Sequence, residues 1–214
     1  MSVRRIAAFD FDGTLTRRDT LAPFLIYACG RRAFARAASR AMTAGARTRL
    51  GAGAADTHHR DAAKSVLLAD LLGGRDRAWL SDSGANYARR LSNQVRPEMA
   101  AQVAWHRSEG HELVMVSASL CAYLDPFGRE HQFDHVIAVS MQSDPSGRLT
   151  GLLDGPNVRG PEKAVRFGEW LGGDSAEIWA YGNSSGDAEL LALASHPVWI
   201  GSRKPSVTTR VPSR

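Results

Sequence analysis

The sequence predicts an α/β fold, with a Rossmann-like parallel sheet as its core and an all-helical segment inserted after the first strand. Stretches typical of strands and helices alternate through most of residues 97–200, as in a parallel sheet covered by helices on both faces. The apolar run Ile6–Phe9 is a further strand, and residues 17–95 between these two parts show only helical patterns. The first strand is therefore expected to join a sheet whose remainder follows a helical insert.

Changes of pattern set the expected domain boundaries. The core comprises residues 1–16 and 96–200, and a helical cap comprises residues 17–95. The core resumes at Arg96, because the proline that follows it is favoured in the first turn of a helix. Residues 201–214 are polar, basic and interrupted by prolines, so they are expected to form a disordered tail.

Each expected element is bounded by a capping residue, a glycine, a proline or a change of periodicity. The cap helices cover about residues 20–30, 31–44, 56–73 and 75–91, with a glycine- and alanine-rich loop over 45–55. The core helices cover about 99–108, 160–171 and 188–194, and a short helix from 120 stops near Pro126 and Gly128. Further strands are expected at 112–116, 136–141, 148–153, 177–181 and 197–200, of which 148–153 pairs with its predecessor.

Composition restricts the class of protein. A chain of 214 residues can bury the core of one domain with a smaller insert. It contains no run of about 18 apolar residues, so no membrane span is expected. The N-terminus lacks the features of a signal peptide, and Cys29 and Cys121 lack metal or redox spacing. A cytoplasmic protein with free thiols is expected.

The net charge of +5 is unevenly distributed. Residues 17–96 carry 15 Lys/Arg and 6 Asp/Glu, whereas the rest of the chain carries 12 and 16. A basic lobe could attract nucleic acid, an acidic membrane surface or a small anionic substrate. An arginine-rich composition explains it equally well, because 24 of the 27 basic residues are arginine. No nucleic-acid-binding motif accompanies the charge, so no nucleic-acid partner is expected.

Two aspartates follow the first strand directly. In an extended backbone the spacing of Asp10 and Asp12 points both carboxylates to the same side, and Gly13 allows a tight turn after them. Open α/β sheets bind ligands at the carboxyl ends of their strands, and paired carboxylates need a cation or a proton. An ordinary polar turn would explain the pair alone equally well.

Three further places carry comparable chemistry. Ser117 follows one strand, and Asn183 and Asp187 follow another. These side chains should converge with the aspartate pair, because the carboxyl ends of parallel strands face one crevice. Lys163 lies at a helix start, where the helix dipole disfavours a cation, and it is one of only three lysines in the chain. A functional role therefore explains Lys163 better than solvation does.

In this order the motifs resemble those of the haloacid dehalogenase (HAD) superfamily. The first is Asp10-Phe-Asp-Gly-Thr-Leu-Thr, the second ends a strand at Ser117, the third is Lys163 and the fourth is Gly182-Asn-Ser-Ser-Gly-Asp187. The insert after the first motif resembles the helical cap of subclass IB, which contains phosphoserine phosphatases. The resemblance covers nearly the whole chain except the tail.

The resemblance implies a phosphoric monoester hydrolase. Asp10 would attack phosphorus and form an aspartyl-phosphate, and Asp12 would act first as general acid and then as general base. Ser117 would hydrogen-bond a phosphoryl oxygen, and Lys163 would neutralise negative charge. Mg²⁺ would relieve the repulsion between the carboxylate and the phosphate. Its expected ligands are Asp10, Asp12, Asn183 and Asp187.

The expected substrate is a small phosphorylated metabolite, such as phosphoserine or glycerol phosphate, and a lysophospholipid headgroup phosphate also fits. The expected substrate contacts are Thr14, Asp19, Arg49 and Ala118. Further cap candidates are Arg47, Arg60 and Lys64. The basic lobe is interpreted as a lid that gathers phosphorylated substrates, and the sequence leaves a homodimer open.

Three positions depart from the family pattern. Asn183 stands where the family often has aspartate, so one negative charge is missing from the expected metal site. Gly13 stands where phosphoserine phosphatases usually have serine. They also have an acidic residue nine positions after the nucleophile, and here that position holds Asp19, which has a shorter side chain. The resemblance therefore does not single out phosphoserine as the substrate.

Two other functions fit parts of the sequence. Gly182-Asn-Ser-Ser-Gly186 matches the elbow of serine hydrolases, with Ser184 as nucleophile. The acid and the histidine would have to be Glu189 and His196, which lie too near in sequence to come from separate strand ends. A receiver-like phospho-acceptor would use similar residues, but receivers carry the aspartate on their third strand.

Overall fold

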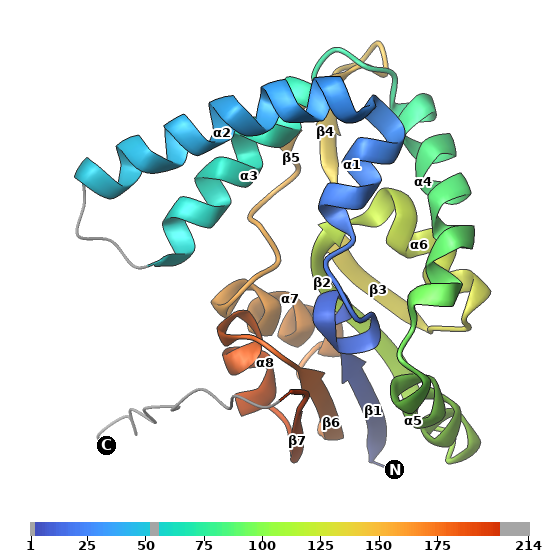
Figure 1. Ribbon diagram of the computed structural model, residues 1–214. Helices are drawn as coiled ribbons and strands as arrows, with labels where there is room; N and C mark the ends of the chain where they lie inside the picture. Colours follow the sequence, from blue (N-terminus) through green and yellow to red (C-terminus); the bar gives the residue numbers. More distant parts are fainter. Residues whose placement is uncertain (1–2, 52–55, 202–214) are drawn as a thin grey trace.

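The computed structural model describes residues 3–51 and 56–201, and the side chains of residues 44–60 lie outside the description. Its main sheet is parallel and has the strand order β3-β2-β1-β6-β7 (Figure 1). The strands are β1 (Arg4–Phe9), β2 (Glu112–Leu120), β3 (His135–Val139), β6 (Ala176–Gly182) and β7 (His196–Trp199). The predicted α/β class is confirmed.

The first strand of the chain is the central strand of this sheet. Its residues from Ile6 to Phe9 are 0% exposed, as expected where both faces of a parallel sheet are covered. Phe9 pairs in register with Met115 of β2 and with Tyr181 of β6. At this level β1 ends and β6 has one more residue, whereas β2 continues to Leu120. The residues after β1 and β6 therefore share one edge of the sheet with the last part of β2.

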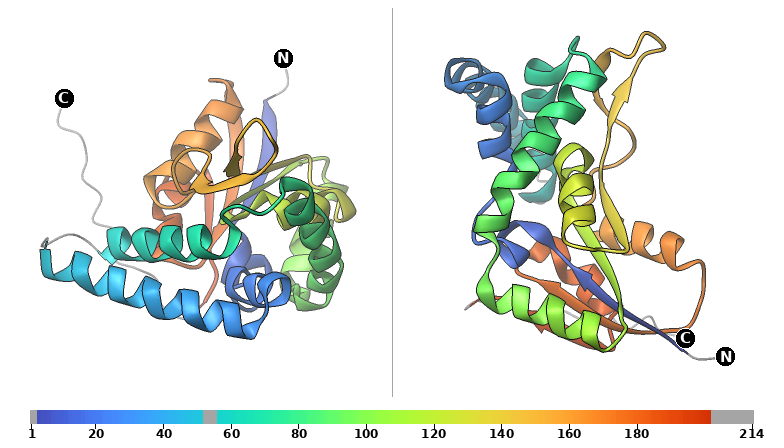
Figure 2. Two further views of the ribbon diagram at one scale, coloured as in Figure 1. Left: turned by 90° about the horizontal axis from the view of Figure 1, so that it is seen from above. Right: turned by 90° about the vertical axis from the view of Figure 1, so that its right-hand side faces the viewer.

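Helices cover both faces of the sheet. They are α5 (Pro97–Ser108), α6 (Cys121–Glu130), α7 (Pro161–Leu171) and α8 (Ala188–Ala192). The helices α5 and α7 pack on the sheet from opposite sides (Figure 2). Their amino ends and the loops after the strands surround the edge that carries the polar motifs.

The insert after β1 is helical, as expected. It contains α1 (Leu21–Cys29), α2 (Arg31–Gly51), α3 (Asp56–Leu72) and α4 (Arg77–Leu91). The helices α2 and α3 lie side by side and extend away from the sheet (Figure 1). No helix within the described residues is long and apolar enough to span a membrane. The division of the chain into a core and a cap stays a prediction.

A two-stranded hairpin from the second half of the chain packs on the insert. Its strands are β4 (Met141–Ser143) and β5 (Leu149–Leu153), paired antiparallel. The amide of Gly74 donates to the carbonyl of Leu149 over 2.8 Å, and the amide of Leu149 donates to the carbonyl of Arg75 over 2.8 Å. The end of α3 is thereby joined to the segment that leads back to the sheet.

Four expected elements differ from the structure. The strand predicted over 112–116 continues to Leu120, so Ser117 lies within β2 and not after it. The loop predicted over 45–55 is wrong for residues 45–51, which continue α2. Between the two glycines at 45 and 51 lie one alanine, two arginines and one leucine, and these residue types favour a helix. Residues 52–55 and the tail from residue 202 lie outside the described residues. The strand predicted over 136–141 is two strands, because the chain leaves the sheet after Val139 and starts the hairpin at Met141.

Helix α6, expected to stop near Pro126 and Gly128, continues to Glu130. A proline at 126 leaves the carbonyl of Ala122 without its usual helical donor. This oxygen faces Gly84 of α4, and a Cβ built on Gly84 would lie 2.0 Å from it. The glycine thus allows α4 and α6 to approach closely where the proline has freed a carbonyl.

This close approach predicts opposite effects of the same substitution in two helices. Gly84→Ala should lower the free energy of unfolding by about 1–3 kcal/mol, because the new methyl group collides with the Ala122 carbonyl. Gly168→Ala in α7, where nothing lies within 4 Å of the added Cβ, should raise it by roughly 0.5–1 kcal/mol. Urea unfolding of both variants measures this, and a stabilising Gly84→Ala would contradict the packing.

Candidate active site

A cavity of about 350 Å³ lies at the carboxyl edge of the sheet, bordered by α3 of the insert. Most of the residues singled out in the sequence line it: Asp10, Asp12, Asp19, Ser117, Ala118, Lys163, Asn183 and Asp187. The chain segments after β1 and β6, the last part of β2 and the start of α7 supply them, except Asp19, which lies just before α1. The expected convergence of the strand ends is therefore observed.

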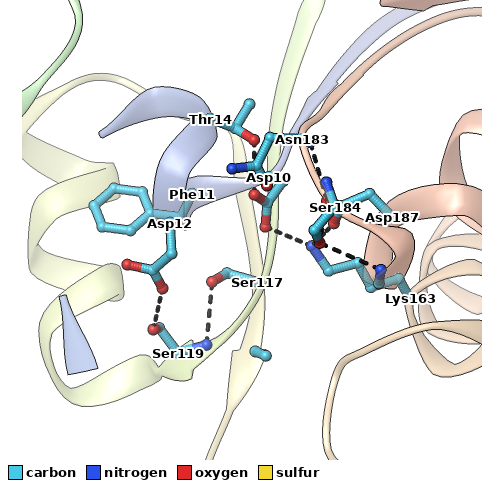
Figure 3. Close-up of polar contacts among 12 residues, drawn as sticks. Asp10, Phe11, Asp12, Thr14, Ser117, Ser119, Lys163, Asn183, Ser184 and Asp187 are labelled. Carbon is cyan, nitrogen blue, oxygen red and sulfur yellow. Dashed lines mark hydrogen bonds and ion pairs between the residues drawn. The ribbon is translucent and has the colours of Figure 1, made fainter. Parts of the chain in front are cut away.

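Lys163 is at the centre of the charges. Its Nζ donates to Asp10 Oδ1 over 2.5 Å and to Asp187 Oδ1 over 2.6 Å (Figure 3). The side chain is 2% exposed, although it starts in the first turn of α7. Burial alone would lower the pKa of Lys163, but the two carboxylates outweigh it and raise that pKa. The lysine stays charged and holds the ends of β1 and β6 together.

Asp10 is buried at the end of the central strand. Burial raises the pKa of Asp10 to about 6, against the opposing charge of Lys163. Its Oδ2 accepts a hydrogen bond of 2.8 Å from the hydroxyl of Thr14. Thr14 is itself fully buried and does not line the cavity. It therefore orients the Asp10 carboxylate from behind.

Asp187 organises the loop after β6. Its Oδ2 accepts hydrogen bonds from the amides of Asn183 and Ser184 and from the Ser184 hydroxyl, over 2.9–3.1 Å. Burial opposes ionisation here too, but the charge and hydrogen bonds of Lys163 prevail and lower the pKa of Asp187. The Ser184 hydroxyl is thus used as a structural cap. Among the described residues no histidine lines this cavity to activate Ser184.

Asp12 points away from Asp10 and toward the insert (Figure 3). Its Oδ1 accepts from the amide and the hydroxyl of Thr20 over 2.7 and 2.6 Å, and its Oδ2 accepts from the Ser119 hydroxyl over 2.5 Å. Burial outweighs these hydrogen bonds and raises the pKa of Asp12. Thr20 directly precedes α1, so the first helix of the insert starts at this carboxyl group.

Ser117 is buried at 1% exposure near the end of β2. Its Oγ accepts a hydrogen bond of 3.1 Å from the amide of Ser119. Because this bond uses a lone pair, the hydroxyl hydrogen remains to be donated to a ligand in the cavity.

Gly13 and Asn183 fit each other. Gly13 has φ +80°, a conformation that other residues rarely adopt. A Cβ built on it would lie 2.0 Å from Asn183 Nδ2. Any side chain at residue 13 would therefore strain the backbone and collide with the amide. Two of the three departures from the family pattern, Gly13 and Asn183, thus lie against each other.

Other residues of the cavity carried little signal in the sequence: Asp61, Ser119, Asn157 and Arg159. Ser119 lies two positions after Ser117 on β2, so strand alternation could have found it. Asn157 and Arg159 come from an irregular segment that matches no pattern. Lys64, one of several expected cap candidates, does line the cavity. The side chains of Arg47, Arg49 and Arg60 lie outside the described residues.

The donor set of the cavity fits a hard divalent cation. No three histidine, cysteine or carboxylate side chains gather into a metal site in the described part of the chain. A cation would instead use mixed oxygens: the carboxylates of Asp10 and Asp187, the amide of Asn183 and the carbonyl of Asp12, which Mg²⁺ accepts. The single charge of Lys163 leaves the buried pair Asp10 and Asp187 with excess negative charge, which also favours a cation.

A family model described as haloacid dehalogenase-like hydrolase matches residues 7–192. The chain belongs to this HAD family. The matched segment spans all four motifs, so the resemblance noted in the sequence is confirmed, and the protein is a hydrolase by family.

The chain is also similar to individual proteins and solved structures. Protein CicA from Caulobacter vibrioides is 33% identical over 190 residues, which cover 88% of this chain and 82% of CicA. The crystal structure of a protein with unknown function from Bordetella pertussis Tohama I matches with TM-score 0.70 and 25% identity, over 90% and 87% of the two chains. A phospho-aspartyl intermediate analogue of phosphoserine phosphatase matches with TM-score 0.59 and 16% identity, over 90% and 84%, which is a likeness of fold.

The charge cluster predicts a large cost for losing its cation. Lys163→Met should lower the free energy of unfolding by about 3–5 kcal/mol without divalent metal, because Asp10 and Asp187 are left buried and unpaired. Arg166→Met removes a more exposed ion pair with Glu162 in the same helix and should cost less than about 1 kcal/mol. Chemical unfolding in chelator compares the two, and equal small losses would be inconsistent with a buried charge cluster.

Proposed function

We propose that this protein is a Mg²⁺-dependent phosphomonoesterase of HAD subclass IB that forms an aspartyl-phosphate on Asp10. The observation that carries the proposal is the contact of Lys163 with Asp10 in a polar cavity that also holds Asp12 and Ser117. These four groups supply a nucleophile, an acid, a phosphoryl-oxygen donor and a counter-charge. Residues 17–95 would be the cap that selects the substrate.

In the first step an Asp10 carboxylate oxygen attacks phosphorus and the bond from phosphorus to the leaving oxygen breaks. The proton of Asp12 passes to that leaving oxygen, so the product leaves as an alcohol. The raised pKa of Asp12 favours a carboxyl group that still holds this proton. Ser117 donates its hydroxyl hydrogen to a phosphoryl oxygen, and Lys163 balances the charge that collects beside Asp10.

In the second step the Asp12 carboxylate takes a proton from a water molecule. The water oxygen attacks phosphorus, the bond between phosphorus and Asp10 breaks, and inorganic phosphate is released. Thr14 holds the regenerated carboxylate through its hydroxyl. Bound Mg²⁺ would be held by Asp10, Asp12, Asn183 and Asp187, where it would reduce charge repulsion and orient the phosphoryl group.

The walls of the cavity favour a small polar leaving group. Apart from Ala118 and Gly186, its lining residues carry polar or charged side chains, including Asp19, Lys64 and Arg159. Such walls fit hydroxylated or charged metabolites, such as phosphoserine or glycerol phosphate, better than an apolar chain. A solved neighbour of the same fold is a phosphoserine phosphatase. The cytoplasmic location and a homodimer stay predictions.

The nucleophile assignment predicts that Asp10→Asn abolishes turnover. The loss should be on the order of a thousandfold or more, because an amide oxygen cannot form the phosphoenzyme. Phosphate release from a panel of phosphorylated metabolites, with Mg²⁺ present, measures the effect. Asp82→Asn, an exposed acid on α4, is the matched control and should keep full activity. An Asp10→Asn variant that is as active as the wild-type protein would refute the assignment.

The cation assignment predicts that chelation stops turnover and that added Mg²⁺ restores it. Loss of nearly all turnover is expected after chelation, since Asp10 and a phosphate dianion repel each other without a divalent cation. Phosphate release before EDTA, after EDTA and after repletion provides the measurement. Metal-independent hydrolysis together with labelling of Ser184 by a fluorophosphonate probe would favour a serine hydrolase instead.

A further inference from the structure

Lys64 reaches from the insert to the end of β2. Its Nζ donates to the carbonyl oxygen of Ala118 over 2.5 Å and also to Asn157 Oδ1. The amide nitrogen of Asn157 donates in turn to Asp61 Oδ1 over 2.6 Å. Asp61 lies one turn before Lys64 on α3. The ammonium group is therefore oriented between two acceptors, one of which is itself fixed to the same helix.

The acceptor Ala118 belongs to a short relay of hydrogen bonds. The peptide group that offers its carbonyl to Lys64 offers its N–H, on Ser119, to Ser117 Oγ over 3.1 Å. A cation bound to a peptide carbonyl polarises the group and makes its N–H a stronger donor. The hydrogen bond also fixes the orientation of this peptide group, because the Ala118 carbonyl cannot rotate without breaking its bond to Lys64.

The relay ends at the Ser117 hydroxyl, whose hydrogen is still available for donation. Ser117 Oγ accepts from Ser119, so its hydrogen is directed to another acceptor. Ser117 lines the same cavity as Asp10 and Lys163. The position of the Ser117 hydroxyl, and its strength as a donor to an anion, therefore depend on the peptide that Lys64 holds.

We propose that Lys64 is a positioning residue for phosphoryl binding, which acts on Ser117 through the Ala118–Ser119 peptide. This inference rests on the proposed function and adds to it a coupling between α3 and the phosphoryl subsite. Asn157 and Asp61 keep the ammonium on the Ala118 carbonyl. A substrate phosphate is then bound most tightly when α3 occupies the position described here.

Two other roles of Lys64 make different predictions. As a direct contact to the leaving group, Lys64 would matter for substrates but not for inorganic phosphate, which has no leaving group. As a structural tie between α3 and β2, it would change stability, and its effect would not depend on Ser117. Only the positioning role makes the effect of Lys64 on free phosphate depend on the Ser117 hydroxyl.

The test is a double-mutant cycle on the full-length protein, with inorganic phosphate and Mg²⁺ as the ligands and calorimetry as the readout. Lys64→Met should weaken phosphate binding about tenfold, as expected for losing a charge-assisted hydrogen bond. The same change in Ser117→Ala should weaken it less than about twofold. Lys64→Arg should recover most of the affinity, because a guanidinium also donates to the carbonyl.

Two controls keep the test decisive. Arg40→Met removes a cation from α2 that pairs with exposed Asp70, and it should leave phosphate affinity unchanged. Asn157→Leu keeps Lys64 but removes one acceptor, so it should weaken phosphate binding several-fold, again only when Ser117 is present. If Lys64→Met does not fold, the double-mutant cycle is measured with Asn157→Leu in its place.

Equal losses in the wild-type and Ser117→Ala backgrounds, or no loss at all, would overturn the inference. So would an equal loss in Arg40→Met, which would show a general charge effect. Phosphate binding needs no turnover, so the two proposals fail separately. Wild-type turnover that requires Asp10, without coupling between Lys64 and Ser117, overturns only this inference. Coupling without turnover of any phosphomonoester overturns only the proposed function.

Discussion

The structure depends on one buried contact, in which Lys163 bonds both Asp10 and Asp187. Buried charges are stable only when each has an oppositely charged partner and further hydrogen bonds. Thr14 supplies such a bond to Asp10, and the loop amides supply them to Asp187. The contact therefore fixes β1, the start of α7 and the loop after β6 around one point. A reaction on phosphate needs the same arrangement, so stability and chemistry share these residues.

The insert is connected to this centre through two separate hydrogen-bond systems. Thr20, at the start of α1, holds the Asp12 carboxyl group, and Lys64 of α3 holds the peptide after Ser117. In both cases a helix outside the sheet controls the direction of a group that faces the cavity. Ser119 belongs to both systems, because its hydroxyl bonds Asp12 and its amide bonds Ser117. The acid and the phosphoryl donor are thus oriented together.

The sequence predicted the sheet and the first contacts of the cavity because they depend on local rules. The local pattern of an apolar strand followed by two aspartates is enough to place Asp10 at the end of that strand. The parallel arrangement then brings Ser117 and Asp187 to the same edge of the sheet. Those rules did not place Asn157, since its role arises only when an irregular segment meets α3. They also ended α6 too early, because the freed carbonyl before Pro126 is accommodated by Gly84 on another helix.

The central claim is that phosphorus becomes bonded to Asp10 during the reaction. The most direct measurement is a crystal structure of the full-length protein with Mg²⁺ and beryllofluoride, which mimics a carboxyl-bound phosphoryl group. The account predicts beryllium on an Asp10 oxygen, with Lys163 and the Ser117 hydroxyl directed to its fluorides. Beryllofluoride bound to another side chain, or a cavity that stays empty at saturating concentration, would contradict it.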